Sequence, residues 1–276
     1  MCRLLGMLLL DPSYASRYLL SDPCSLYVQS RVNPSRLQGD GWGVGFYVNG
    51  ALRIVKSWKP VYEELERFKA TMENINSSIV IAHVRRASNP RKLPKEKLIS
   101  VENSQPFGYR NYLFAHNGVI TIPDEAANLL GGWQSNIRGL NDSEIYFWYI
   151  IKELSEGRSI PEALKNFQRD LSRVWRETCE KYPDKDEPYI GLNIIFSDGN
   201  KLYAYCKYDE AKYRQARSLC YGDQPAMQMT FLADSEKLIV ASEKTNGEEN
   251  WQPLKSRHLL VSQIIDGRVK FHIQEC

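Results

Sequence analysis

Residues 1–10 have the sequence MCRLLGMLLL, in which an apolar run follows Arg3 and continues to Leu10. A short, continuous apolar run is typical of a strand that is buried on both faces. We therefore predict a core strand over residues 3–10, beginning almost at the amino terminus. Such a strand would fix the first residues inside the fold instead of leaving them frayed.

The rest of the chain predicts strands, then a helical block, then further strands. Asn49-Gly50 is a strong hairpin signal, and Ser159 with Glu162 forms a capping box at the start of a helix. Apolar patterns predict strands within residues 39–49, 51–56, 79–84, 112–116, 190–196, 202–208, 227–232, 238–242, 259–265 and 269–273, and helices near residues 60–75, 142–157 and from 159 onward. This order predicts an α+β fold in which helices cover antiparallel sheets.

The composition is that of an ordinary globular protein, with 43% hydrophobic and 25% charged residues. No linker interrupts the 276 residues, so we expect a single domain over residues 1–276. The 36 basic and 33 acidic residues are spread along the chain, which argues against nucleic acid as a partner.

The amino terminus and the cysteines bear on the cellular compartment. The first ten residues carry one basic residue, lack a cleavage signature and are too short to span a bilayer, so we expect no membrane association. The six cysteines form no CxxC pair and no regular framework, which predicts neither a zinc site nor a disulfide scaffold. We expect a cytoplasmic protein.

Cys2 is the first candidate for catalysis. Removal of Met1 would leave a thiol and a free α-amine on one residue, so that nucleophile and base coincide. An α-amine ordinarily has a pKa of about 7.7 to 8.0 and a thiol one of about 8.5, so the amine can accept the thiol proton near neutral pH. The alternative is that Cys2 is a small apolar residue at the start of a buried strand.

Two arginines follow the predicted strand over residues 79–84. Arg85 or Arg86 could bind a substrate carboxylate through two parallel hydrogen bonds, as an amino-acid substrate requires. A structural ion pair is the alternative for either residue.

Asn117-Gly118 follows the predicted strand over residues 112–116. The pair could form an oxyanion hole from the Asn117 amide and the Gly118 N–H, or simply a hairpin turn. Asp142 could bind a substrate ammonium group or cap a helix, and Asp40 is first of all a turn residue.

Seven segments occur in a fixed order, namely MCRLLG, GDGWGVGFY, HVRRAS, ENSQPF, FAHNGVI, LNDSE and VASEKTN. Together they resemble the class II glutamine amidotransferases, a branch of the amino-terminal nucleophile hydrolases. They are similar above all to the stand-alone branch, which includes the γ-glutamyl hydrolase of ergothioneine biosynthesis and a subunit of the glutathione-degrading complex. The resemblance extends from Met1 to about Leu260 and implies a four-layer αββα sandwich of two antiparallel sheets.

The resemblance also implies roles for individual residues. Cys2 would be the nucleophile with its own amine as base, and Asn117 and Gly118 would form the oxyanion hole. Arg85, helped by Ser88, would bind the substrate α-carboxylate. The α-ammonium group would be received by Asp142 and the backbone near Gly118.

Three positions depart from the family pattern. Arg86 stands where the amidotransferases that make amino sugars have Trp, which favours the stand-alone branch. Lys244 replaces the usual proline after the late Ser-Glu pair, and Gln105 stands where His is frequent, so these two positions bear on substrate access.

The sequence therefore predicts an amidohydrolase that cleaves the side-chain amide of glutamine or a γ-glutamyl compound through a γ-glutamyl thioester, with no metal or organic cofactor. One alternative is a glutaminase subunit that delivers ammonia to a separate synthase partner. Another is a catalytically silent binding protein, against which the presence of all the implied site residues counts.

Overall fold

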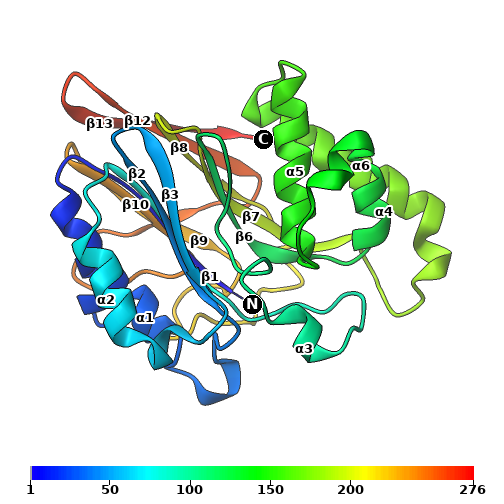
Figure 1. Cartoon of the computed structure of the whole chain (residues 1–276), viewed down its shortest axis with the longest axis horizontal. Coiled ribbons are helices and arrows are strands. Elements are labelled where there is room, and N and C mark those ends of the chain that lie inside the picture. The colour runs from blue at the N-terminus through cyan, green and yellow to red at the C-terminus, as the bar shows by residue number, and fades with distance from the viewer. Residues whose placement is uncertain (1) are drawn as a thin grey trace.

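Two antiparallel sheets lie face to face, with helices on both outer sides, in the computed structural model, which describes residues 2–276 (Figure 1). The helices α1 and α2 cover the first sheet, and α4, α5 and α6 lie beyond the second (Figure 1). The predicted αββα fold class is confirmed.

The first sheet has the strand order β11-β9-β10-β1-β4-β2-β3. Its strands are β1 (Arg3–Leu9), β2 (Trp42–Val48), β3 (Ala51–Ser57), β4 (Ile79–Val84), β9 (Met229–Ala233), β10 (Lys237–Ala241) and β11 (Gln252–Leu254). The second sheet has the order β13-β12-β8-β7-β6-β5. Its strands are β5 (Phe107–Tyr109), β6 (Tyr112–Ile120), β7 (Tyr189–Ser197), β8 (Lys201–Cys206), β12 (His258–Ile265) and β13 (Arg268–Glu275).

The α-helices are α1 (Leu26–Gln29), α2 (Leu65–Glu73), α3 (Lys95–Leu98), α4 (Pro123–Asn128), α5 (Asp142–Ser155) and α6 (Ile160–Thr178). A π-helical turn spans Arg17–Ser21, and 3-10 turns lie at Pro12–Tyr14, Pro34–Arg36, Val61–Glu63, Gly131–Asn136 and Cys179–Lys181. Among the described residues, no helix is both long and apolar enough to cross a membrane.

The strand β1 is central to the first sheet, as its sequence predicts. It pairs antiparallel with β10 on one side and β4 on the other, and all seven of its residues are buried. Its alternate side chains pack toward the second sheet and toward α1 and α2. At Gly6 the sheets approach so closely that a Cβ would lie 2.5 Å from Ile195 Cγ2 on β7, so a larger side chain would clash unless Ile195 or the backbone moved.

Helix α5 lies against the second sheet through an almost wholly buried apolar surface. The side chain of Asn141 caps the helix by accepting the N–H of Ser143 at 3.0 Å. The alternative that Asp142 caps the helix is therefore wrong by one residue, and the carboxylate of Asp142 is free for other partners. The predicted capping box of α6 is confirmed, since Ser159 donates its N–H to Glu162 at 2.8 Å.

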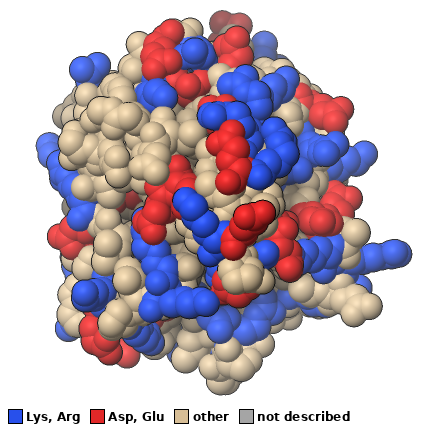
Figure 2. Space-filling model, turned by 90° about the vertical axis from the view of Figure 1, so that its right-hand side faces the viewer, with Lys and Arg blue, Asp and Glu red and all other residues tan. Residues whose placement is uncertain are grey.

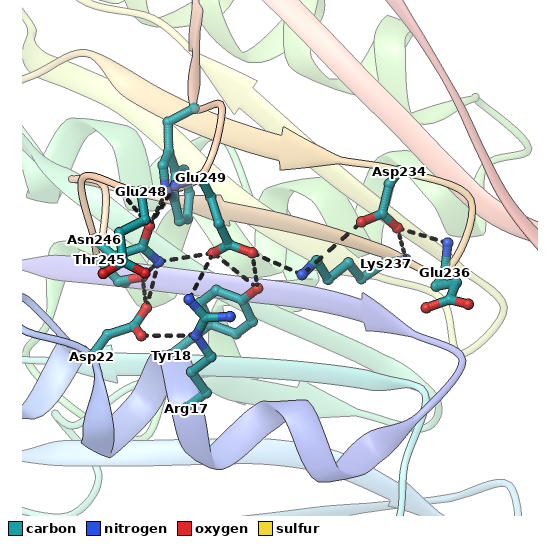
Figure 3. Close-up of polar contacts among 11 residues, drawn as sticks. Arg17, Tyr18, Asp22, Asp234, Glu236, Lys237, Thr245, Asn246, Glu248 and Glu249 are labelled. Carbon is teal, nitrogen blue, oxygen red and sulfur yellow. Dashed lines mark hydrogen bonds and ion pairs between the residues drawn. The ribbon is translucent and has the colours of Figure 1, made fainter.

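A polar network ties the segment before α1 to the loop that follows β10 (Figure 3). Glu249 accepts hydrogen bonds from Lys237 at 2.8 Å and from Asn246 at 2.8 Å. Asp22 binds Arg17 at 2.9 Å and also accepts a hydrogen bond from Asn246 at 2.8 Å. These contacts fix the loop that begins at residue 242, directly beside the start of β1.

One disulfide is present, although the spacing of the six cysteines predicts no disulfide scaffold. It joins Cys24 and Cys220 across 196 positions of sequence. Cys24 precedes α1, whereas Cys220 lies in the loop between β8 and β9. Their pairing depends on the sheet order, which cysteine spacing does not reveal.

Candidate active site

The thiol of Cys2 lies next to the turn that follows β4. Its Sγ contacts the backbone of Arg86, at 3.3 Å from the carbonyl oxygen and 3.4 Å from the nitrogen. Burial raises the pKa of the Cys2 thiol, while the Arg86 backbone and the charge of Arg85 act in the opposite direction. A thiol in this state needs a base to ionise near neutral pH. The predicted base, the free amine of Cys2, depends on Met1, which lies outside the described residues.

Of the two arginines, only Arg85 directs a buried guanidinium toward the site. Its Nη1 donates to the carbonyl oxygen of Leu98 at 2.9 Å and to that of Asp40 at 3.2 Å. Burial lowers the pKa of Arg85, and Cys2, Asp40 and Asp142 counteract this effect by charge. The side chain of Arg86 is exposed, so this residue reaches Cys2 through its backbone alone.

Asp40 holds the segment after β4 that contains the arginines. Its Oδ2 accepts the N–H of Ala87 at 2.8 Å, and its own N–H donates to the carbonyl oxygen of Arg85 at 3.0 Å. Lys95 approaches its other carboxylate oxygen at 3.7 Å. Asp40 itself lies at a bend before β2, in keeping with the turn role expected of it, and it stabilises the segment after β4 against which Cys2 packs.

Asn117 and Gly118 lie within β6, opposite Asn193 and Leu192 of β7. The alternative that these residues form a hairpin turn is therefore wrong. A β-bulge interrupts the pairing directly after Gly118, and a Cβ at Gly118 would lie 2.0 Å from the backbone oxygen of Gly191. Only glycine fits at this position. The Asn117 Nδ2 donates to Ser242 Oγ at 3.4 Å.

Asp142 is buried and uses both carboxylate oxygens. Oδ1 accepts the hydroxyl of Ser88 at 2.8 Å, and Oδ2 accepts the N–H of Ile120 at 2.7 Å. Ser88, which the family resemblance associates with Arg85, donates here to Asp142. This carboxylate acts on the Cys2 thiol by charge, so the site combines a thiol with one cation and one anion.

Two residues of the segment VASEKTN make buried polar contacts near the site, Ser242 with the nucleophile strand and Glu243 with the loop at residues 219–221. Ser242 Oγ accepts the N–H of Leu4 at 2.9 Å. Glu243 accepts the N–H groups of Leu219, Cys220 and Tyr221 at 2.6, 2.7 and 3.1 Å. The motif VASEKTN points to both residues, but it does not show which groups their side chains bond.

Within residues 2–276, Cys24, Cys220 and Glu243 form the group of side chains that comes closest to a metal-ligand set. Both sulfurs are joined in the disulfide, and both carboxylate oxygens of Glu243 accept backbone N–H groups. The donors of this group are therefore occupied by the protein itself.

A cavity of about 550 Å³ lies between β3, β5 and α5. It is lined by aromatic side chains together with Lys56, Arg67 and Arg138. None of Cys2, Arg85, Asn117 and Asp142 lines it. The candidate site is therefore defined by the contacts around Cys2 and not by this cavity.

Charged side chains of both signs are interspersed on the face that carries α4, α5 and α6 (Figure 2). This face shows no continuous stripe of a single sign, in keeping with the formal net charge of +3.

Sequence comparisons find relatives along most of the chain. The family model for class II glutamine amidotransferases matches residues 1–275. The gamma-glutamyl-hercynylcysteine sulfoxide hydrolase of Mycobacterium tuberculosis is 26% identical over 264 residues, which cover 94% of this chain and 92% of that protein. An uncharacterized protein of Methanocaldococcus jannaschii is 31% identical over 174 residues, which cover 61% of this chain but only 43% of that protein.

Solved structures share the fold. A glutamine aminotransferase class-II domain protein from Silicibacter pomeroyi has a TM-score of 0.60 at 16% identity, covering 98% of both chains. The glutamine phosphoribosylpyrophosphate amidotransferase of B. subtilis has a TM-score of 0.61 at 15% identity, covering 98% of this chain and 49% of that one. At such identities the likeness extends to the fold alone.

Proposed function

Because the chain belongs to the class II glutamine amidotransferases, a family of enzymes, we propose that it hydrolyses the side-chain amide of glutamine or of a γ-glutamyl compound, with Cys2 as nucleophile. The predicted family is confirmed by the match over residues 1–275. The observation that carries the proposed chemistry is the contact of Cys2 Sγ with the turn that carries Arg85, where both Arg85 and Asp142 act on the thiol by charge.

The reaction starts with proton transfer from the Cys2 thiol to its own α-amine, which is free once Met1 has been removed. The thiolate attacks the γ-amide carbon and forms a tetrahedral intermediate. The Asn117 side-chain amide and the Gly118 N–H donate hydrogen bonds to its oxyanion. The protonated α-amine of Cys2 then donates its proton to the leaving nitrogen. Ammonia or an amine departs, and a γ-glutamyl thioester remains.

Water then attacks the thioester, with the Cys2 amine again accepting a proton, and glutamate is released with the thiol restored. These steps use protein side chains and backbone groups without a metal or organic cofactor. Positioning, the thiolate and the oxyanion donors lower the barrier.

The two charged side chains fit the ends of an amino-acid substrate. Arg85 would bind the α-carboxylate, since its guanidinium offers several donors and only Nη1 is taken by Asp40 and Leu98. Asp142 would receive the α-ammonium, with Ser88 and the N–H of Ile120 holding its carboxylate in place. The proposed substrates carry a γ-glutamyl group whose α-carboxylate and α-ammonium are both free, so their binding requires the charges of both Arg85 and Asp142.

A second candidate function is the supply of ammonia to a separate synthase subunit. The fold of this chain matches 49% of the B. subtilis amidotransferase chain, so in that protein the shared fold is one part of a larger chain. The similarity to the mycobacterial hydrolase covers 92% of that relative, which favours a hydrolase that acts alone.

The test is to incubate the processed protein with glutamine and with a panel of γ-glutamyl amides, and to measure released glutamate. Cys2→Ala should abolish release while the circular dichroism spectrum and melting temperature stay close to those of the wild type. Turnover of one γ-glutamyl amide well above that of glutamine favours the hydrolase. Weak turnover that a synthase partner increases favours the second candidate, and release by Cys2→Ala contradicts both.

A further inference from the structure

Ser242 follows β10 at the point where this strand leaves the first sheet. Its N–H donates to the carbonyl oxygen of Leu4 at 3.0 Å, and its Oγ accepts the N–H of Leu4 at 2.9 Å. In a regular antiparallel pair the carbonyl oxygen of Ser242 would accept that N–H. Here Gln224 Nε2 donates to this carbonyl at 3.0 Å. The Ser242 hydroxyl accepts the N–H of Leu4 in place of the carbonyl.

The same hydroxyl oxygen contacts the second sheet. Asn117 Nδ2 on β6 donates to Ser242 Oγ at 3.4 Å, and both side chains are almost wholly buried. The Asn117 Oδ1 has no hydrogen-bond partner within residues 2–276. Ser242 is therefore the side chain that orients the Asn117 amide, and it leaves the second N–H of Nδ2 free to donate elsewhere.

We propose that Ser242 is a positioning residue that aligns the nucleophile strand with the oxyanion donor, an inference that rests on the proposed function. One oxygen holds the N–H of Leu4, two residues after Cys2, and the amide of Asn117 on the opposite sheet. Small displacements of either group would separate the attacking sulfur from the site where the oxyanion forms. Ser242 itself does not contact the reacting atoms.

The kinetic test compares Ser242→Ala, Ser242→Thr and Ser262→Ala. Ser262 on β12 is a matched control because it is also a buried serine. Its Oγ donates to the carbonyl oxygen of Leu202 at 3.1 Å. Ser242→Ala should lower kcat by about 10- to 100-fold with little change in KM, and Ser242→Thr should restore most of kcat. Equal kcat values for Ser242→Ala and the wild type would overturn the inference, as would a rise in KM alone.

A double-mutant cycle separates positioning from a general effect on folding. If Ser242 acts through Asn117, then Ser242→Ala should change kcat much less in the Asn117→Ala background than in the wild type. If the fold-decreases in kcat of the two single variants multiply in full in the double variant, the two side chains act independently. That result would contradict the inference.

Hydrogen exchange tests the geometry without relying on catalysis. Ser242→Ala removes the acceptor of the Leu4 N–H, so this amide should exchange at least about tenfold faster, while amides of β12 should keep their protection. Unchanged protection at Leu4 would overturn the inference even in an active enzyme. Failure of the proposed function would instead appear as glutamate release by Cys2→Ala, or as no release by the wild type.

Discussion

Cys2 combines an accessible position with an environment that opposes ionisation. Its side chain is partly exposed, yet burial of the sulfur raises the thiol pKa, and Asp142 adds to that rise by charge. Arg85 and the Arg86 backbone act in the opposite direction. Because these effects oppose one another, the base that removes the thiol proton decides whether the residue can act as a nucleophile.

The raised thiol pKa has a measurable consequence when Met1 is retained and no free α-amine adjoins the thiol. An acid with a raised pKa ionises only at higher pH, so alkylation of Cys2 by iodoacetamide should reach half its maximal rate above about pH 8.5. In the processed protein the amine and thiol titrate as a pair, and the profile should change shape and extend to lower pH. Identical profiles for the two forms would exclude the amine as the base.

Arg85 and Arg86 form a natural matched pair, since they are adjacent and only Arg85 is buried. Arg85→Gln should raise KM for glutamine by roughly 10- to 100-fold, because a charge-assisted contact with the substrate carboxylate is lost. Arg86→Gln keeps the backbone that contacts Cys2 and should leave KM within about twofold. Steady-state kinetics on both folded variants check this. Equal KM values for them would argue against Arg85 as the carboxylate ligand.

Asn117 can be tested in the same way. Removal of one oxyanion donor typically lowers kcat by about 10²- to 10³-fold, and Asn117→Ala should fall in that range with KM nearly unchanged. A kcat close to that of the wild type would mean that Asn117 does not contact the oxyanion. Pre-steady-state kinetics should place the loss in formation of the thioester.

At the scale of elements, the sequence predicted most strands and the main helices because their apolar periodicity is local. The strand β4 lies at residues 79–84 as predicted, and β1 ends one residue earlier than expected. The end of β6 was misplaced, because polar residues that a strand normally excludes continue its pairing with β7. The short strands β5 and β11 have three residues each, too few to show a period.

The same distinction applies to the site. The candidate residues could be found from motifs, but the bonds that hold them join positions far apart in sequence. Ser242 and Asn117 are 125 positions apart, and Ser88 and Asp142 are 54 apart. Such contacts depend on sheet order and register, which no local pattern encodes.

The loop between β8 and β9 is held by the Cys24–Cys220 disulfide and by Glu243. A disulfide that closes a long loop stabilises a protein by about 2–5 kcal/mol. Cys220→Ser should therefore lower the free energy of unfolding of the oxidised protein by that amount in urea titrations. Cys179→Ser, at a partly exposed free thiol, is the control. Equal unfolding free energies for the two variants would mean that the bond does not stabilise the fold.

At the scale of the whole molecule, the buried interior contains polar side chains as well as an apolar core. His83 on β4 and His116 on β6 are both completely buried. Burial lowers the pKa of His83 well below its usual range, and it lowers the pKa of His116 as well. Neither ring nitrogen of His83 has a hydrogen-bond partner within the described part of the chain.

These histidines predict the pH dependence of stability. Below about pH 6.5 these histidines bind protons in the unfolded chain but stay neutral in the folded protein, so the free energy of unfolding should fall with decreasing pH. Each histidine contributes a slope of about 1.4 kcal/mol per pH unit between its unfolded and folded pKa. Urea titrations from pH 7 to 5 should show a smaller slope for His83→Gln than for the wild type. Equal slopes would contradict a buried neutral His83.

The account depends above all on Cys2 as an amino-terminal nucleophile. Mass spectrometry of the amino-terminal peptide, after incubation of natively expressed protein with glutamine and an acid quench, tests this claim directly. We expect a peptide that begins at Cys2 and carries one glutamyl group, and no such adduct in Cys2→Ala. A peptide that retains Met1, in protein that nevertheless releases glutamate, would contradict the proposed mechanism.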